Sequence, residues 1–307
     1  MQLIRGLPNL RASHGRLAVS IGSYDGIHLG HRALLERLRA HGERLGGATV
    51  LVTFEPLPRE YLSPGDPPPR LTSLRERWRL LAETGIDYVW LLRFDERVRT
   101  MSGEAFAQRL RGQLGAAVVV VGHDFRFGRN GEATVAFLEA AGAQMGFSVD
   151  VVPPVVVDGA RVSSSRIREA LARGDLRQAE RWLGRPYGMC GRVVEGNRLG
   201  RKLGYPTANL RLGRRRAALA GIFAVRVRGP SAEALPAVAS LGNRPTVDGR
   251  ETLLEAHLFD FTGDLYGREI EVEFVEKLRE EERFASVEAL VEQMNRDAAA
   301  ARRILNA

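Results

Sequence analysis

The chain has a single cysteine, Cys190, and only two lysines among its 45 basic residues. One cysteine cannot form an internal disulfide or a multi-cysteine zinc site, and its place in an apolar run favours a buried packing role over a nucleophile. No run of about 18 apolar residues is present, so we expect no transmembrane helix. The N-terminal segment lacks the apolar core and cleavage site of a signal peptide. We therefore expect a mature cytoplasmic protein.

The charge is strongly positive, with a formal net charge of +8 and a pI near 10.3. Such a surface attracts polyanions, so an RNA-binding protein is one class to consider. The arginines are scattered along the chain, however, and no compact basic patch with interleaved aromatic residues is visible in the sequence. Nucleotide substrates would be attracted equally well. We therefore expect no nucleic-acid partner.

The length of 307 residues suggests about two domains. Up to about residue 152, apolar strand-like runs alternate with helical patterns. The expected strands are 17–21, 48–54, 88–92, 117–121 and 148–152, and helical patterns cover 31–45 and 73–83. Ser73 and Glu76 have the spacing of a capping box. Nearly continuous apolar strands that alternate with helices predict a doubly wound parallel sheet, which binds ligands at the carboxyl ends of its strands.

The pattern changes at residues 184–186, after a helical region at 165–183. Short strands at 188–195, 222–228, 237–241, 253–259 and 269–275 predict an antiparallel barrel or sandwich. A helix capped by Ser286 closes the chain. Its expected apolar stripe consists of Val287, Leu290, Val291, Met294, Ala298, Ala301 and Ile304. We therefore expect one domain at 1–185 and another at 186–307.

The string GSYDGIHLGH, residues 22–31, directly follows the first expected strand. Glycines let the backbone approach a phosphate, and a helix N-terminus offers N–H groups and positive potential. His28 and His31 lie three residues apart in the first turn and would point to the same side. Two imidazoles aimed at one phosphate could stabilise the charge that develops at an α-phosphorus. The alternative is a glycine-rich turn whose histidines only cap a helix.

Two further segments fall where this site would lie. In VGHDFRFG, residues 121–128, Phe125 and Phe127 could line an adenine or flavin pocket and Asp124 could bind a hydroxyl or a metal. An aromatic core loop is the alternative. In RVSSSRIR, residues 161–168, hydroxyls and guanidiniums at a helix start suit a triphosphate. An N-cap followed by solvated arginines is the alternative.

These strings, together with FEPLPRE, resemble the adenylyltransferase module of the prokaryotic bifunctional riboflavin kinase/FMN adenylyltransferases. The resemblance implies a nucleotidylyltransferase fold in which His28 and His31 contact the phosphates of ATP. Tyr24 stands where Phe is common and Leu57 where His is often found, and neither change removes a phosphate ligand. The implied nucleotide-binding positions are Gly22, Asp25, Gly30, Asp124, Arg161, Ser164, Arg166 and Arg168, and the implied flavin-binding positions are Phe125 and Phe127.

A second group of polar residues opens the C-terminal half. Gly200, Lys202 and Gly204 make a plausible phosphate loop. Thr207 and Asn209 alternate along an extended segment, so both oxygens face one side. Hard oxygen ligands of this type suit Mg²⁺ held jointly with nucleotide phosphates. Considered as spacing alone, a turn with local hydrogen bonds is the better explanation.

Glu255 and His257 share one face of the strand expected at 253–259. A carboxylate among apolar residues could accept a proton from an attacking hydroxyl. A salt-bridged glutamate at the rim of a barrel is the alternative. We interpret His257 as structural.

The strings GRVVEGNRLGRKLGYPTANL, LGNRPTV, LEAHLFDFTGDLYG and RFASVEAL resemble the riboflavin kinase module of the same family. The resemblance implies that Thr207 and Asn209 help to hold Mg²⁺, that Gly200, Lys202 and Gly204 bind nucleotide, and that Glu255 deprotonates the riboflavin 5′-hydroxyl. Residues 240–242 read Ser-Leu-Gly where the family usually has Asn-Ile-Gly, a change of little expected consequence.

The two resemblances cover nearly the whole chain in the family's order. They imply an α/β nucleotidylyltransferase domain followed by an antiparallel β-barrel riboflavin kinase domain with a closing helix. The implied substrates are ATP, riboflavin and FMN, with Mg²⁺ as cofactor and no membrane partner, and we expect a monomer or weak homo-oligomer. A single-activity nucleotidylyltransferase with a flavin-sensing C-terminal module is the alternative.

Overall fold

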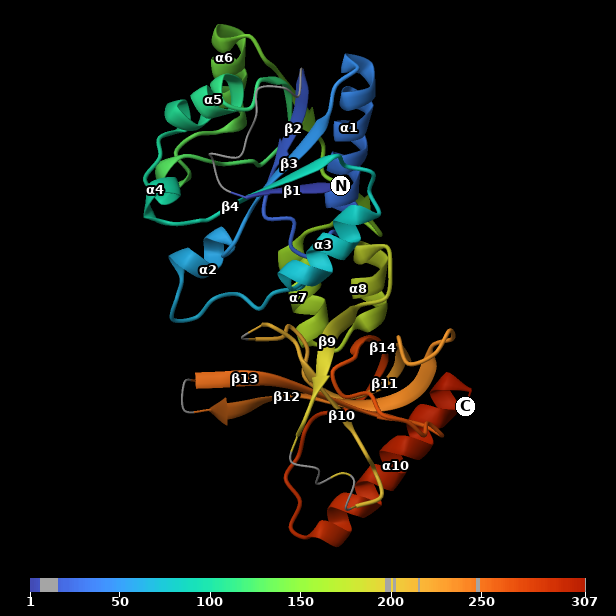
Figure 1. Ribbon diagram of the computed structural model, residues 1–307. Coiled ribbons are helices and arrows are strands. Elements are labelled where there is room, and N and C mark those ends of the chain that lie inside the picture. The colour runs from blue at the N-terminus through green and yellow to red at the C-terminus, as the bar shows by residue number, and fades with distance from the viewer. Residues whose placement is uncertain (6–15, 197–199, 201–202, 215, 247–248, 307) are drawn as a thin grey trace. The chain divides into compact units, whose positions relative to one another are not determined.

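Six strands form the sheet of the N-terminal half, and every neighbouring pair is parallel, in the order β1-β4-β3-β2-β5-β6 (Figure 1). The computed structural model describes all residues except 6–15, 197–199, 201–202, 215, 247–248 and 307. The strands are β1 (Gln2–Arg5), β2 (Leu17–Ile21), β3 (Thr49–Phe54), β4 (Tyr88–Leu92), β5 (Ala116–Gly122) and β6 (Ser148–Val152). The predicted parallel sheet is therefore confirmed, and β1 is a sixth strand that the sequence pattern did not indicate.

Helices cover both faces of this sheet. Successive residues of a strand point to opposite faces, so each strand contributes to two cores. Val19 and Ile21 of β2 pack in one core with residues of α5 (Gly103–Gly112) and α6 (Val135–Met145). Ala18 packs in the other core with α1 (Leu29–Leu45) and α3 (Leu74–Ala82). The remaining short elements are α2 (Pro58–Leu62), α4 (Glu96–Arg99), the 3-10 turn η2 (Arg129–Gly131) and the hairpin of β7 (Val156–Val157) and β8 (Ala160–Arg161).

The C-terminal half contains a closed barrel with the strand order β10-β13-β12-β11-β14-β9, in which all pairs are antiparallel. The strands are β9 (Gly188–Val194), β10 (Ala208–Arg211), β11 (Gly221–Arg228), β12 (Leu235–Thr246), β13 (Gly249–Leu258) and β14 (Glu269–Arg279). Closure removes the free edges that an open antiparallel sheet would expose. Of the two architectures that the strand pattern allowed, the structure is the barrel.

The closing helix α10 (Val287–Leu305) begins at Ser286, whose side chain accepts a hydrogen bond from the Ala289 N–H. The C-terminal part of its apolar face packs on the barrel, with Ala298, Ala301, Ile304 and Leu305 against Ala224 and Phe259. Val287 was expected to belong to the buried apolar stripe, and this prediction is wrong. Val287 is the first residue of the helix and is 56% exposed. Asp297 is buried on the packed face instead.

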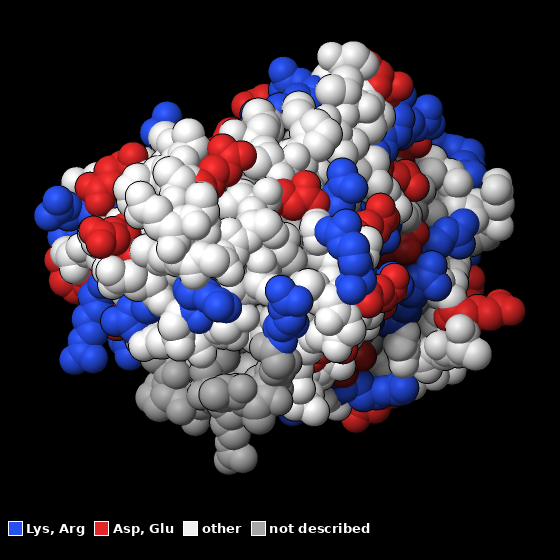
Figure 2. All heavy atoms as spheres, turned by 90° about the horizontal axis from the view of Figure 1, so that it is seen from above, with Lys and Arg blue, Asp and Glu red and all other residues white. Residues whose placement is uncertain are grey.

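Basic side chains are not gathered into one patch on the face drawn in Figure 2, where Lys and Arg lie among Asp and Glu. This mixture agrees with the scattered arginines of the sequence. On this face the charge pattern therefore resembles an ordinary solvated surface.

The chain divides into two compact units, residues 1–68 with 77–162 and residues 69–76 with 163–307. The helical region expected at 165–183 is two helices, α7 (Ser164–Ala172) and α8 (Leu176–Leu183), separated at Gly174 with φ 75°. Both helices belong to the second unit. The segment 69–76 also belongs to it, although the segment lies within the N-terminal half of the sequence.

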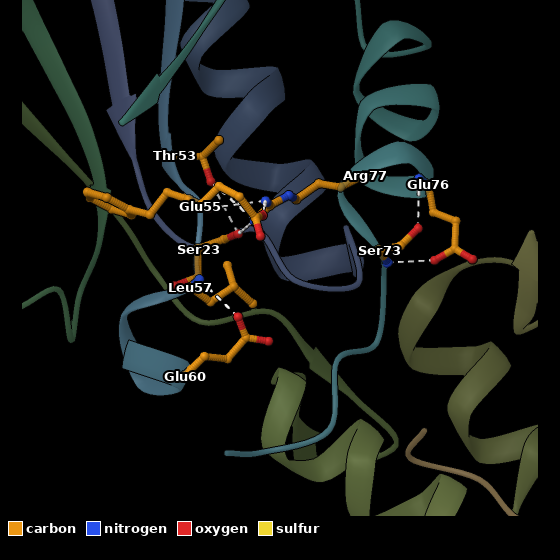
Figure 3. A network of polar contacts seen from close by, with 9 residues as sticks. Ser23, Thr53, Glu55, Leu57, Glu60, Ser73, Glu76 and Arg77 are labelled. Carbon is orange, nitrogen blue, oxygen red and sulfur yellow. Dashed lines mark hydrogen bonds and ion pairs between the residues drawn. The ribbon is translucent and has the colours of Figure 1, made fainter. Parts of the chain in front are cut away.

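Glu76 explains why this segment belongs to the second unit. Its carboxylate accepts a hydrogen bond from the Ser73 N–H at 2.6 Å, and the Ser73 hydroxyl accepts one from the Glu76 N–H, which confirms the predicted capping box (Figure 3). The same carboxylate accepts the Cys190 N–H at 2.7 Å and pairs with Arg214. Arg214 is completely buried and also donates to the Tyr187 hydroxyl. Cys190 is itself buried, as expected.

We predict that Glu76→Ala lowers the free energy of unfolding by about 3–5 kcal/mol, because it leaves the buried Arg214 guanidinium without its counter-charge. Adding Arg214→Met should recover much of that loss. The matched control is Glu269→Ala, which removes the partner of the exposed Arg75 in the same unit and should cost at most about 1 kcal/mol. Calorimetric unfolding of the three variants measures these differences. Equal losses in Glu76→Ala and Glu269→Ala would contradict the prediction.

Candidate active sites

The end of the loop between β2 and α1 and the first turn of α1 carry the two histidines expected to bind phosphate. His28 is the N-cap of α1, and its Nδ1 accepts a hydrogen bond from the His31 N–H at 3.2 Å. The two imidazole rings are stacked, with centroids 3.6 Å apart and planes 14° apart. Because Nδ1 of His28 is an acceptor, a neutral His28 carries its proton on Nε2, where it is a donor. The helix-cap alternative and the phosphate-binding hypothesis are therefore compatible.

Glycines make room for this arrangement. A Cβ at Gly30 would lie 3.2 Å from the His28 ring and 3.8 Å from the Val162 carbonyl oxygen. A Cβ at Gly22 would lie 3.0 Å from the Tyr24 ring. Asp25 is buried within the same loop. The segment that leads toward the Ser-Arg motif thus passes beside the histidine loop at Val162.

The histidine loop has an unusual backbone. Tyr24, Gly26 and Ile27 have φ values of 49°, 93° and 40°. Residues other than glycine rarely adopt positive φ values of this kind. Tyr24 is fully buried, and its hydroxyl is 2.6 Å from the Ser20 hydroxyl. Burial raises the pKa of Tyr24, opposed only in part by the bond with Ser20, so the phenol stays protonated. This anchoring lets the loop keep a strained conformation.

Asp124 and Arg161 form an ion pair within the first unit, after β5 and at the end of β8. Burial acts to raise the pKa of Asp124, but the hydrogen bond and the charge of Arg161 outweigh it, and the pKa lies below its ordinary value. The carboxylate is therefore ionised at neutral pH. The structure brings these two predicted nucleotide-binding residues together.

The Ser-Arg motif lies at the start of α7. Ser163 is the N-cap and accepts a hydrogen bond from the Arg166 N–H at 3.3 Å. Ser164 is the first helical residue, the Arg166 side chain is exposed, and Arg168 donates from Nε to the Pro69 carbonyl oxygen at 2.7 Å. These residues belong to the second unit, whereas the histidines and Arg161 belong to the first. The approach of this motif to the histidines stays a prediction.

Phe125 and Phe127 line an apolar cavity of about 210 Å³ in the first unit. Their rings are stacked at 5.4 Å, and Phe127 also contacts Phe106 at 5.7 Å. The other lining residues come from the ends of β2 and β3 and from nearby loops and helices: Ile21, Phe54, Pro58, Leu62, Phe94, Val98, Met101, Arg126, Gly128 and Gly131. An apolar, aromatic cavity of this kind suits a flat ring. Leu57, where the family often has His, is buried and is not among the lining residues.

The barrel unit contains a second cavity, of about 310 Å³, and the predicted kinase residues Gly200, Asn209 and Glu255 line it. The predicted nucleotide-binding residue Gly204 is not among its lining residues. Asn209 on β10 pairs with Glu255 on β13, and Glu255 pairs in turn with Ser240 on β12. These three residues therefore form a row across neighbouring strands. Thr207 precedes β10 and lines the same cavity. Its remaining walls are Leu203, Tyr205, Ile222, Val238, Ala239, His257, Arg279, Glu281, Glu282, Phe284, Leu290, Met294 and Asp297.

Close packing explains two of the glycines around this motif, and a positive φ explains a third. A Cβ at Gly196 would lie 2.6 Å from the Asn209 amide, and one at Gly200 would lie 2.3 Å from the Tyr205 carbonyl oxygen. Gly204 has φ 84°. The predicted nucleotide-binding residue Lys202 lies outside the described residues.

His257 acts on the position of Thr207. Its Nδ1 lies 2.9 Å from the Pro206 carbonyl oxygen, so the ring holds the residue before Thr207. Thr207 also lines a smaller hollow of about 90 Å³, whose walls include Phe261 and Tyr266. Thr207 therefore lies between two spaces. The position of His257 agrees with the structural role that we expected for it.

The barrel cavity also has an ionic wall, whose residues were not among those expected from the sequence. Arg279 makes a two-pronged ion pair with Asp297, with N···O distances of 3.0 and 2.8 Å. Glu281 accepts a hydrogen bond from the Ser240 hydroxyl at 3.3 Å and packs where a Cβ at Gly242 would lie. The signal available in the sequence was Asp297, the one acidic residue on the otherwise apolar face of α10.

No group of three or more His, Cys, Asp and Glu residues that could hold a metal exists within the part of the chain that the structure describes. The oxygens of Thr207, Asn209 and Glu255 at the cavity are hard donors, as Mg²⁺ requires. These donors fit a metal held jointly with phosphates better than one held by protein alone. Among the described helices, none is long and apolar enough to cross a membrane.

The fold and the two sites define a two-module transferase, in which a nucleotidylyltransferase-like sheet precedes a kinase-like barrel. Residues 10–166 match the FAD synthetase family model and residues 183–305 match the riboflavin kinase family model. The chain belongs to the bifunctional riboflavin kinase/FMN adenylyltransferase family.

Curated relatives match along nearly their whole length. The chain is 47% identical to the bifunctional riboflavin kinase/FMN adenylyltransferase of Pseudomonas fluorescens, over 98% of this chain and 97% of the relative. It is 43% identical to that of Escherichia coli K12, with the same coverage. A solved Streptococcus pneumoniae structure, described as a macrolide-efflux protein, is 31% identical and superposes with a TM-score of 0.83 over 98% of each chain.

Proposed function

We propose that this chain makes FAD from riboflavin in two ATP-dependent steps, one at each site. It is a riboflavin kinase and an FMN adenylyltransferase, because both family models match and its relatives carry both activities over the full chain. The observation that carries the residue assignments is that each module has its own group of polar residues and its own cavity. We assign phosphoryl transfer to residues 186–307 and adenylyl transfer to residues 1–185.

In the kinase step, the riboflavin 5′-hydroxyl attacks the γ-phosphorus of ATP, a new O–P bond forms and ADP leaves. Glu255 is the base that accepts the hydroxyl proton, since it is half-buried on the cavity wall between Asn209 and Ser240. The apolar side chains of Leu290 and Met294 favour the flavin ring in the 310 Å³ cavity. The hollow with Phe261 and Tyr266 on the other side of Thr207 suits the nucleotide base.

Thr207 and Asn209 would hold Mg²⁺ together with the phosphates of ATP. Both supply neutral oxygens, so nucleotide must provide most of the negative charge around the ion. When bound, the ion would neutralise charge on the transferring phosphoryl group. His257 keeps the Pro206–Thr207 segment in place, and Gly196 lets the backbone lie against the Asn209 amide.

In the adenylylation step, a phosphate oxygen of FMN attacks the α-phosphorus of ATP and pyrophosphate leaves. His28 and His31 donate hydrogen bonds to the phosphates, and the N-terminus of α1 adds positive potential. Phe125 and Phe127 pack against the flavin in the aromatic cavity. Gly22, Asp25, Gly30, Asp124, Arg161, Ser164, Arg166 and Arg168 complete the proposed nucleotide site.

The proposed substrates are therefore ATP, riboflavin and FMN. On the face drawn in Figure 2, Lys and Arg are mixed with Asp and Glu, so this face carries no single basic patch of the kind that binds RNA. We further propose a cytoplasmic monomer or weak homo-oligomer.

We predict that His28→Asn slows conversion of FMN to FAD by about 10²–10³-fold, because one preorganised donor is lost. Asn keeps an acceptor for the His31 N–H, so helix α1 should remain capped and the protein should unfold at the wild-type temperature. His28→Ala should lose both the rate and about 1 kcal/mol of stability. Assays with FMN and ATP, together with thermal unfolding, separate the two effects. A wild-type rate for His28→Asn would mean that His28 only caps helix α1 and has no role in adenylyl transfer.

We predict that Glu255→Gln forms no detectable FMN from riboflavin but converts supplied FMN to FAD at the wild-type rate. The amide keeps the shape of the side chain and cannot accept the hydroxyl proton. His28→Asn is the reciprocal control and should stop at FMN. Chromatography of the flavins over time measures both steps. Loss of both activities in a folded Glu255→Gln protein would contradict the assignment of one reaction to each site.

We predict that Thr207→Val reduces FMN formation most strongly at limiting Mg²⁺, because it keeps the shape of the side chain without the oxygen. Thr207→Ser keeps the hydroxyl and should require nearly the wild-type Mg²⁺ concentration. Titration of the kinase rate with Mg²⁺ at fixed ATP gives the comparison. The same Mg²⁺ dependence in both variants would argue against Thr207 as a ligand.

A further inference from the structure

Arg77 on helix α3 is 1% exposed and is not part of any motif quoted above. Its NH1 donates to the Ser23 carbonyl oxygen at 2.7 Å, and its NH2 donates to the Phe54 carbonyl oxygen at 3.1 Å and to the Glu55 carboxylate at 3.0 Å (Figure 3). Thr53 lies beside it, 3.5 Å from NH1. All these residues belong to the first unit. One buried guanidinium therefore binds two backbone segments at once.

The two segments are those that carry the proposed adenylylation site. Ser23 lies in the histidine loop, five residues before His28. Phe54 ends β3, and its ring lines the aromatic cavity with Phe125 and Phe127. The guanidinium thus fixes the phosphate-binding loop relative to the cavity that we assign to the flavin.

The histidine loop needs such support. The residue after Ser23 is Tyr24, the first of the three residues with left-handed φ angles. A residue other than glycine that adopts a left-handed φ angle costs on the order of 1–3 kcal/mol of folding free energy. Such a conformation persists only where the surrounding structure holds it in place. The Thr53 hydroxyl also donates to the Ser23 carbonyl oxygen, at 3.3 Å. Two side chains therefore converge on the carbonyl at the base of the strained loop.

Stability alone is a poor reason for a buried arginine here. A buried cation loses its hydration, and an apolar side chain of similar volume often stabilises a fold as well or better. Only the planar fork of Arg, with its several fixed donors, reaches two carbonyl oxygens and a carboxylate together. The number and direction of the hydrogen bonds of Arg77 indicate that it holds two backbone segments in place.

We propose that Arg77 is a positioning residue for adenylyl transfer, which acts through the Ser23 and Phe54 carbonyl groups and touches no reacting group. This inference rests on the proposed function of the histidine loop. Displacement of reacting groups by about 1 Å can cost about 10²-fold in rate. The effect of removing Arg77 should therefore fall on turnover rather than on substrate binding.

The test compares Arg77→Lys and Arg77→Met in the full chain. Arg77→Met should lower kcat for FMN adenylylation by about 10²-fold while the KM values for FMN and ATP change less than about threefold. Arg77→Lys keeps the charge and one donor group, so its kcat should lie between those of Arg77→Met and the wild type. Riboflavin phosphorylation by the same preparations is the internal control and should stay within about twofold of wild type.

Thr53→Val provides a milder variant if Arg77→Met does not fold. It removes the second donor to Ser23 and should lower kcat for adenylylation by about 3–10-fold. Thr49→Val is its matched control on the same strand, because Thr49 is equally buried and its hydroxyl bonds Asp87 at 2.7 Å, at the opposite end of β3. Thr49→Val should lose stability without losing kcat.

If kcat follows the loss of stability across Arg77→Lys, Thr53→Val and Thr49→Val alike, Arg77 is only a structural residue and the proposal is overturned. If His28→Asn is fully active, the proposed function of the histidine loop is wrong, and the positioning role of Arg77, which rests on it, is wrong as well. If His28→Asn is inactive while Arg77→Lys and Thr53→Val turn over normally, only the positioning role fails.

Discussion

The carbonyl oxygen of Ser23 is the point on which the first site depends. The chain leaves β2 there and enters a loop with three left-handed residues before α1 begins at the histidines. Such a loop is not a free-energy minimum by itself. Arg77 and Thr53 hold its base, the buried Tyr24 holds its middle, and the His28 cap holds its end. The stacked imidazoles are therefore the product of several buried polar contacts.

The second site depends on a different constraint, which is the register of an antiparallel barrel. Pairing of β10 with β13, and of β13 with β12, places Asn209, Glu255 and Ser240 side by side. A slip of one residue would turn Glu255 away from the cavity and bring an apolar neighbour into it. Leu254 and Ala256 on either side are fully buried, so such a slip would also bury the carboxylate. The core thus fixes the register that the proposed role of Glu255 requires.

The sequence predicted the parts of this structure that leave a local pattern. The strands β2, β4 and β6 have the expected bounds. The interior strands β2 and β4 are covered on both faces and read as nearly continuous apolar runs. β1 leaves a weaker pattern, since its four residues begin and end with polar side chains. The break between α7 and α8 lies at Gly174. A single glycine within a helical pattern does not by itself indicate that the helix ends, so the sequence did not predict this break. Both site motifs leave a local pattern, because the residues of each motif are close together in the chain. The glycines and histidines of the first motif lie within residues 22–31, and Pro-Thr-Ala-Asn of the second is residues 206–209.

Contacts with the backbone leave no such pattern. Arg77 binds the carbonyl oxygens of Ser23 and Phe54, and every residue has a carbonyl, so nothing in the sequence marks these two as its partners. The same holds for Glu76, which receives the N–H of Cys190 and pairs with Arg214, 138 residues away. In the sequence, Glu76 was marked only by its capping-box spacing from Ser73, and Arg77 belonged to no motif.

Adjacent residues of α3 therefore perform separate tasks. Glu76 belongs to the second compact unit and stabilises the Cys190 strand and Arg214, whereas Arg77 belongs to the first unit and supports the histidine loop. The two modules are thus not independent segments of the chain, even though their chemistry is assigned to separate sites. A cut at residue 186 would separate Arg214 from Glu76 and leave a buried guanidinium without its counter-charge, which costs about 3–5 kcal/mol. The proposed division of the two reactions at residue 186 therefore differs from the division into compact units, because the segment 69–76 belongs to the barrel unit.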